Sequence, residues 1–137
     1  MTTIVIRQVV PVDRRSGHAA ALFGDYFPMQ FEPVVYAITS ELSREYRGGY
    51  WEFYTLSNEG FYMAPDADAP FKVSCQNGYA GVLSADALGI TACLYAYSHL
   101  SFSAGEAIAG VYARQYHLLR EYVMDCPEAA AILSATD

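Results

Sequence analysis

The segment GGYWEFYTLSNEGFYMAP, residues 48–65, decides the fold, because the spacing of its apolar side chains changes from helical to strand-like. Within Trp51–Leu56, the residues at positions 51, 53 and 55 alternate with those at 52, 54 and 56, which is the two-residue repeat of a β-strand. Ser57–Gly60 has the composition of a turn, and Phe61–Ala64 resumes the strand pattern. The segment therefore predicts an antiparallel hairpin.

A second hairpin is predicted directly after the first. Pro65–Pro70 forms a polar loop between two prolines, and Phe71–Cys75 again alternates apolar and polar residues. Asn77-Gly78 favours a type I′ turn, because both central residues of that turn need positive φ, and Tyr79–Leu83 completes the pair. Four strands joined by short turns predict a four-stranded antiparallel β-meander.

One strand-like pattern and two helical patterns precede this region. Ile4–Val10 is strand-like, and a helix beginning at Ser16 is expected to end at Pro28. A second helix is predicted for Pro33–Tyr46, since proline suits the first helical position and one face is apolar. Gly48-Gly49 then supplies its C-terminal stop.

Helical patterns also follow the predicted strands. Ser84 can cap a helix over Ala85–Leu100, which is apolar nearly all round and is expected to be the most buried one. Ser103 and Glu106 have capping-box spacing for the next helix, which ends before Pro127, and a last helical turn is expected to reach Leu133. The order predicts an α+β fold in which about four to five α-helices pack with the meander, as a single domain over residues 1–137.

Composition and charge narrow the class of protein. The chain has 137 residues, 53% of them hydrophobic and 15% aromatic, which favours one folded domain over a disordered chain. Its formal net charge is −7 and Lys72 is the only lysine, so no basic stripe is available for direct nucleic-acid binding. We expect no membrane span and no secretory signal in residues 1–12, and therefore a cytoplasmic protein.

Residues with catalytic or metal-binding chemistry are scattered. The residues concerned are His18, His99, His117, Cys75, Cys93 and Cys126, and none is at zinc-ligand spacing. We expect no metal and no cofactor, and reduced thiols rather than disulfides. A small hydrolase-like enzyme using Glu52 or a Cys–His pair stays open as an alternative, although strand alternation places Glu52 on the face opposite Trp51 and Phe53.

The central block resembles a known family. Gly48–Tyr54, Leu56–Asn58 and Gly60–Pro65 are similar to the most distinctive block of the ArdB/KlcA antirestriction proteins. Phe23-Gly24, with Tyr26-Phe27, and the helix start at Ser84–Ala87 extend the resemblance over nearly the whole chain. It implies a protein of plasmids, other mobile elements or their hosts that protects incoming DNA from type I restriction-modification enzymes. The family is not known for a catalytic reaction, so the resemblance implies no catalytic residues.

The partner expected from this resemblance is a type I restriction-modification enzyme or a host factor linked to it. The candidate partner-binding residues are Glu59, Asp66 and Asp68, because exposed loops often carry function. The fifteen acidic residues are dispersed and seven arginines are interspersed among them, so we predict that the protein does not imitate DNA. A regulatory protein-binding module is the remaining alternative.

Overall fold

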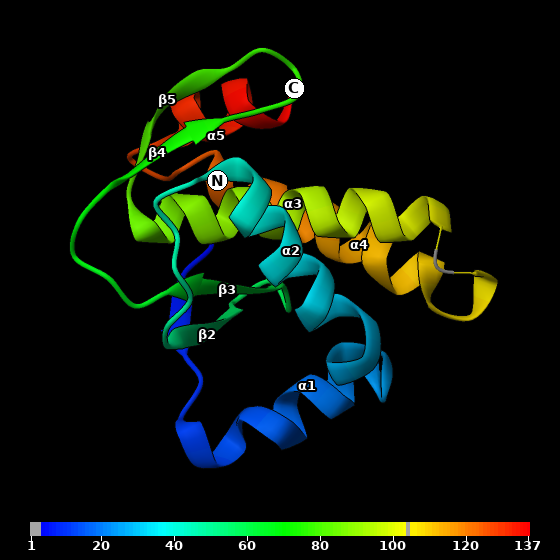
Figure 1. The fold of residues 1–137 in the computed structure, drawn as a ribbon. Helices are drawn as coiled ribbons and strands as arrows, with labels where there is room; N and C mark the ends of the chain where they lie inside the picture. The colour runs from blue at the N-terminus through cyan, green and yellow to red at the C-terminus, as the bar shows by residue number, and fades with distance from the viewer. Residues whose placement is uncertain (1–3, 104) are drawn as a thin grey trace.

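The computed structural model describes residues 4–103 and 105–137 (Figure 1). The elements along the chain are β1 (Arg7–Val9), the 3-10 turn η1 (Val12–Arg14), α1 (Arg15–Phe23), the π-helical turn η2 (Phe27–Phe31), α2 (Glu32–Leu42), β2 (Trp51–Leu56), β3 (Phe61–Pro65), β4 (Phe71–Ser74), β5 (Ala80–Leu83), α3 (Ala85–Ser103), α4 (Glu106–Val123) and α5 (Ala129–Thr136). The predicted α+β class is confirmed. No helix in the described ranges is long and apolar enough to cross a membrane.

The strands form two sheets rather than one meander. The first sheet has the order β1-β2-β3 and the second is the β4–β5 hairpin, and both are antiparallel. The prediction of a single four-stranded meander is therefore wrong in its pairing: β3 does not pair with β4. Pro65 and Pro70 flank the loop between β3 and β4, and neither has a backbone N–H to donate to a strand ladder. The free side of β2 is occupied by β1.

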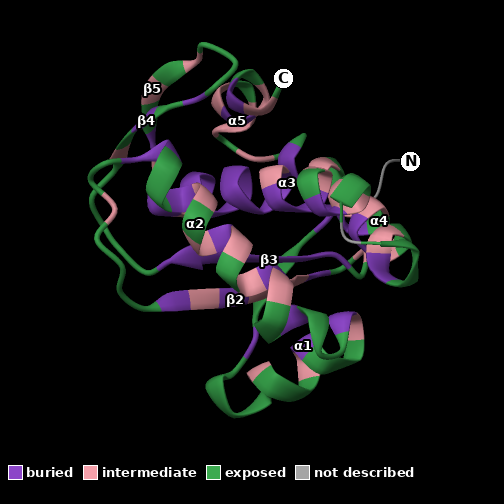
Figure 2. Cartoon of the chain, turned by 45° about the vertical axis from the view of Figure 1, so that its right-hand side comes forward, coloured by how far each residue is buried: buried purple, intermediate pink, exposed green. Residues whose placement is uncertain are grey.

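Helix α3 lies at the centre of the molecule. Figure 1 shows it between the β4–β5 hairpin with α5 on one side and the sheet of β1–β3 on the other, and it contacts α2, α4 and α5. Figure 2 shows α3 buried over most of its length, whereas α1 is largely exposed. The prediction that this helix is the most buried one is confirmed, because its apolar residues cover the whole circumference.

The core includes an aromatic cluster between α1, η2, the first sheet, α3 and α4. The ring centroids of Phe31 and Tyr97 are 4.8 Å apart, and Phe23 stacks on Phe31 at 5.2 Å. Phe61 meets the edges of neighbouring rings, and the Tyr97 hydroxyl donates a 2.7 Å hydrogen bond to the Phe61 carbonyl. The hydroxyl is thereby satisfied inside the core, at no cost of an unpaired polar group.

The helix boundaries differ from the predictions. The helix predicted for Pro33–Tyr46 begins at Glu32 and ends at Leu42, with Ser43 as its C-cap, so Gly48-Gly49 is not its stop. Pro28 does not end the helical path: it lies at the start of η2, where its missing N–H is not needed, and the chain continues into α2. The predicted capping box is wrong, because Ser103 is the last residue of α3 and its hydroxyl donates to the His99 carbonyl. Gly105 is the N-cap of α4 instead.

Candidate functional site

Glu59, the first predicted partner-binding residue, lies in the turn between β2 and β3. Its φ is 77°, a left-handed conformation that glycine or asparagine adopts more readily than glutamate. The side chain is 75% exposed, and its carboxylate accepts a 2.9 Å hydrogen bond from Arg114 of α4. The Gln115 amide donates to the Glu59 carbonyl. The turn is thus held against α4 while its carboxylate stays at the surface.

Asp66 and Asp68 lie at the other end of the hairpin. Both are exposed, and the Asp66 N–H donates to the Tyr50 carbonyl at 2.9 Å. Strand β3 separates them from Glu59, which at about 3.3 Å per residue corresponds to roughly 20 Å. The structure therefore does not bring the three predicted residues together: Glu59 is on one surface and the two aspartates are on another.

A polar cluster that we did not single out from the sequence joins β1, β3 and α3. Arg7 donates to Asp86 at 2.6 Å and to the Tyr62 hydroxyl at 2.8 Å, and Tyr62 donates to the same carboxylate oxygen at 2.7 Å. The Arg7 guanidinium also lies 4.4 Å from the Tyr54 ring centroid. Burial, with the negative charge of Asp86, raises the pKa of Tyr62. The hydroxyl therefore stays protonated and serves as a donor.

Glu52, proposed for the enzyme alternative, is paired with an arginine. Its carboxylate lies 3.7 Å from Arg15, whose guanidinium is 4.7 Å from the Tyr50 ring centroid and 4.6 Å from that of Phe53. Trp51 and Phe53 are buried and Glu52 is half-buried, as the alternation predicted. Arg15 of α1 therefore contacts Glu52 and Phe53 of β2, and these contacts link the helix to the strand.

The three thiols are not activated as nucleophiles. Burial raises the pKa of Cys93 to about 12 and also raises the pKa of Cys75 and of Cys126. A raised pKa keeps each thiol protonated near neutral pH, and the protonated thiol is a poor nucleophile. No group of three His, Cys, Asp or Glu side chains able to hold a metal ion occurs in residues 4–103 and 105–137.

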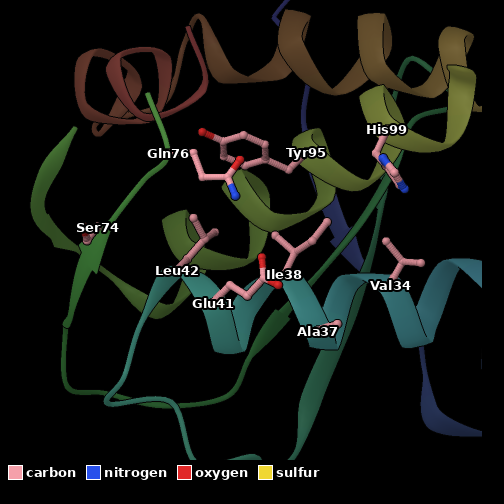
Figure 3. Close-up of a pocket in the computed structure, with 9 residues that line it drawn as sticks. All are labelled: Val34, Ala37, Ile38, Glu41, Leu42, Ser74, Gln76, Tyr95 and His99. Carbon is pink, nitrogen blue, oxygen red and sulfur yellow. The ribbon is translucent and has the colours of Figure 1, made fainter. Parts of the chain in front are cut away.

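One open hollow of about 690 Å³ lies between α2, α3 and the end of β4 (Figure 3). Figure 3 shows Glu41 reaching in from α2, while His99 and Tyr95 lie along α3. The Tyr95 hydroxyl donates to the Ala135 carbonyl, and within the described chain no hydrogen bond joins Glu41, Tyr95 and His99 to one another. The hollow therefore brings these side chains to one surface without hydrogen bonds between them.

Comparison with known proteins shows which class of protein the chain belongs to. Residues 44–137 match the family model described as antirestriction protein. An antirestriction protein KlcA from Escherichia coli is 40% identical over 135 residues, covering 97% of this chain and 95% of the relative. A second KlcA from the same species is 45% identical over 108 residues, covering 77% and 74%. The chain belongs to the antirestriction protein family.

A solved structure is similar over the full length. It is described as showing that the KlcA and ArdB proteins have a novel fold and antirestriction activity against type I DNA restriction systems in vivo but not in vitro. Its TM-score is 0.91 at 39% sequence identity, and the alignment covers 100% of both chains. The resemblance predicted from Gly48–Pro65 is thereby confirmed, and it includes the N-terminal region that the family model does not match.

Proposed function

We propose that this chain protects incoming mobile-element DNA from type I restriction-modification enzymes by non-catalytic protein contacts in the cytoplasm. The observation that carries the proposal is the full-length structural likeness to a protein described as having this activity in vivo. The dispersed titratable groups and the protonated thiols support a mechanism without catalysis.

The proposed contact involves a further cellular component, namely a host factor or the restriction enzyme in its cellular state. The activity described for KlcA and ArdB occurs in vivo but not in vitro. An inhibitor that simply occupied the purified enzyme would act in both settings, because binding depends only on concentration and affinity. A requirement for an additional component accounts for the difference.

The mechanism we propose does not imitate DNA. A duplex carries about one negative charge per 1.7 Å of its axis. Here four carboxylates are paired with arginines, in the pairs Arg7–Asp86, Arg15–Glu52, Arg114–Glu59 and Arg120–Asp137. These four carboxylates are therefore neutralised by neighbouring cations, unlike the phosphates along a duplex.

Phage plating tests the proposal. Unmodified phage is plated on a host with a type I system, with and without expression of this chain, and expression is expected to raise the plating efficiency. Modified phage, which the enzyme does not cut, is the control and should plate equally on both hosts. Unchanged plating of unmodified phage would refute the antirestriction function.

A second assay tests the mechanism. The chain is titrated into a purified type I enzyme with its DNA, and we expect DNA cleavage to continue. Inhibition that weakens with added salt and competes with DNA would instead demonstrate a DNA mimic.

For Glu59, Asp66 and Asp68, which we propose as partner contacts, neutral Asn variants are tested in the plating assay, with Asp125→Asn on another exposed turn as the control.

A further inference from the structure

Asn77 joins the β4–β5 hairpin to the end of α5. Its side-chain NH2 group donates to the Ser134 carbonyl at 2.9 Å and to the Ala135 carbonyl at 3.2 Å. Its side-chain oxygen accepts a 3.0 Å hydrogen bond from the Tyr79 N–H. Figure 1 shows the hairpin beside α5. The carbonyls of a last helical turn have no partner within the helix, so the Asn77 side chain satisfies two of them.

The residue after Asn77 favours chemical loss of this NH2 group. The Cγ atom of an asparagine can be attacked by the backbone nitrogen of the next residue, and a side chain on that residue hinders the approach. Gly78 has no side chain and is exposed to water, and its φ of 94° is one that glycine adopts without strain. The Asn77-Gly78 pair is therefore suited to deamidation.

Asn58 provides a comparison within the same chain, in which Asn58 and Asn77 are the asparagines. It also lies in a turn between two strands, its NH2 group donates to the Leu118 carbonyl of α4 at 2.9 Å, and its oxygen accepts from the Gly60 N–H at 2.9 Å. The residue after it is Glu59, whose side chain hinders attack by the backbone nitrogen. The two asparagines have similar hydrogen bonds and differ in the residue that follows.

We propose that Asn77 is a site of spontaneous deamidation, and that its conversion releases the last turn of α5 from the hairpin. The Gly78 nitrogen loses its proton and forms a bond to Cγ of Asn77, the bond from Cγ to the side-chain nitrogen breaks, and ammonia leaves. Water then opens the succinimide at either carbonyl, which gives aspartate or isoaspartate. Water is the co-reactant, and nothing is oxidised or reduced. This inference does not rest on the proposed function.

The product lacks the groups that hold α5. A carboxylate has no hydrogen to donate to the Ser134 and Ala135 carbonyls. It also places a negative charge at the C-terminal end of a helix, where the exposed carbonyls make negative charge unfavourable. Ile132 and Ala135 of α5 are buried. Release of the last turn therefore admits water to this part of the core.

The folded hairpin controls how fast Asn77 reacts. The Gly78 N–H donates to the Cys75 carbonyl at 3.0 Å, while the Asn77 side chain is held by α5. Attack on Cγ requires these hydrogen bonds to open. The reaction in the folded chain should therefore be slower than in the urea-unfolded chain, on the order of tenfold or more.

Incubation of the folded chain at pH 9 tests the site, because base removes the proton from the attacking nitrogen. Peptide mass spectrometry follows the replacement of NH2 by OH at each asparagine, and enzymatic methylation detects isoaspartate. We expect Asn77 to react on the order of tenfold faster than Asn58, because glycine leaves the backbone nitrogen unhindered, and to give both products. Equal rates at the two positions, or aspartate alone, would overturn the proposed site.

A packing variant tests the control by α5. Ile132→Ala should speed the reaction of Asn77, since Ile132 is 1% exposed and its side chain holds α5 in place. Ile108→Ala is the matched control: Ile108 is 5% exposed and belongs to α4. Thermal unfolding shows that each variant is folded before incubation. Equal reaction rates in the two variants would show that α5 does not protect Asn77.

Hydrogen exchange tests the consequence for α5. Wild-type chain that has been deamidated after folding is separated from unreacted chain by ion exchange. Its amides over residues 129–136 should exchange on the order of tenfold faster, while those of α4 keep their protection. Asn77→Asp should have the same effect, and Asn58→Asp, at the other turn, should leave α5 unchanged. Unchanged exchange in α5 after conversion of Asn77 would overturn the proposed release.

Discussion

Replacing Gly89 by alanine would force α3 away from β3. A Cβ atom at Gly89 would lie 2.4 Å from both the Cα and the Cβ of Ala64, and 2.5 Å from the Met63 carbonyl oxygen. Carbon atoms in contact are normally about 3.5–4.0 Å apart. The atoms in the way belong to the backbone or to a short side chain, so they cannot rotate aside. The helix and the strand would have to separate by roughly 1 Å.

Two opposing effects determine how much Gly89→Ala changes the free energy of unfolding. Inserting a methyl group into a packed core costs about 1–3 kcal/mol, and here the upper value applies because α3 and β3 are buried around the contact. Alanine is favoured over glycine within a helix by about 1 kcal/mol. The free energy of unfolding should therefore fall by about 2 kcal/mol. For a chain of this size, that corresponds to a decrease in Tm of roughly 8 °C.

Denaturant unfolding and calorimetry of Gly89→Ala measure this loss. Gly110→Ala is the matched control, since Gly110 is also inside a helix but a Cβ there has no atom within 4 Å. The control should be stabilised by about 1 kcal/mol through helix preference alone. If Gly89→Ala is as stable as Gly110→Ala, the close approach of α3 and β3 is not what requires glycine.

Three further predictions concern stability. Glu59→Asn should raise the free energy of unfolding by about 1 kcal/mol, because asparagine tolerates positive φ and the exposed pair with Arg114 contributes little; a decrease in denaturant unfolding would show that the ion pair dominates. Phe61→Ala should lower the same quantity by about 3–5 kcal/mol through the cavity it leaves among the core rings, and a loss below about 1 kcal/mol would contradict the packing described. Raising the pH above 10 should lower stability progressively toward pH 12. Burial raises the pKa of Tyr112 to about 12 and raises that of Tyr62. The unfolded chain then loses protons that the folded chain keeps. A constant denaturation midpoint over pH 9–12 would refute this.

Local patterns predicted the strands well because their turns are encoded by neighbouring residues. A turn at Asn77-Gly78 joins β4 and β5 as expected, because the residues that set its backbone angles are adjacent in sequence. The predicted type I′ geometry is wrong, since Gly78 has a positive φ of 94° and Asn77 does not. The division into two sheets could not be predicted in this way. It consists of β3 and β4 not pairing, and of β1 pairing with β2 across more than forty residues. No local periodicity specifies which distant strand takes a position in a sheet.

The candidate site was less predictable than the fold. The contacts of Arg7 with Tyr62 and Asp86 join three segments that are far apart in the chain, so no spacing rule indicates them. The prediction for Glu59 used only its place in a turn. Its left-handed conformation and its pairing with Arg114 depend on how the turn meets α4. Asp66 and Asp68 are close to Glu59 in sequence, but the length of β3 separates them in space.

Trp51 gives the protein a built-in optical reporter. It is the only tryptophan, and it is 3% exposed at the start of β2. Its indole N–H donates to the Tyr46 hydroxyl at 2.9 Å, and the Tyr36 ring meets it edge-on at 5.1 Å. Its fluorescence should therefore have the short emission wavelength of an indole shielded from water, shifting to the red as the sheet opens. The loss of the native state in any variant can be followed by light emission without an attached dye.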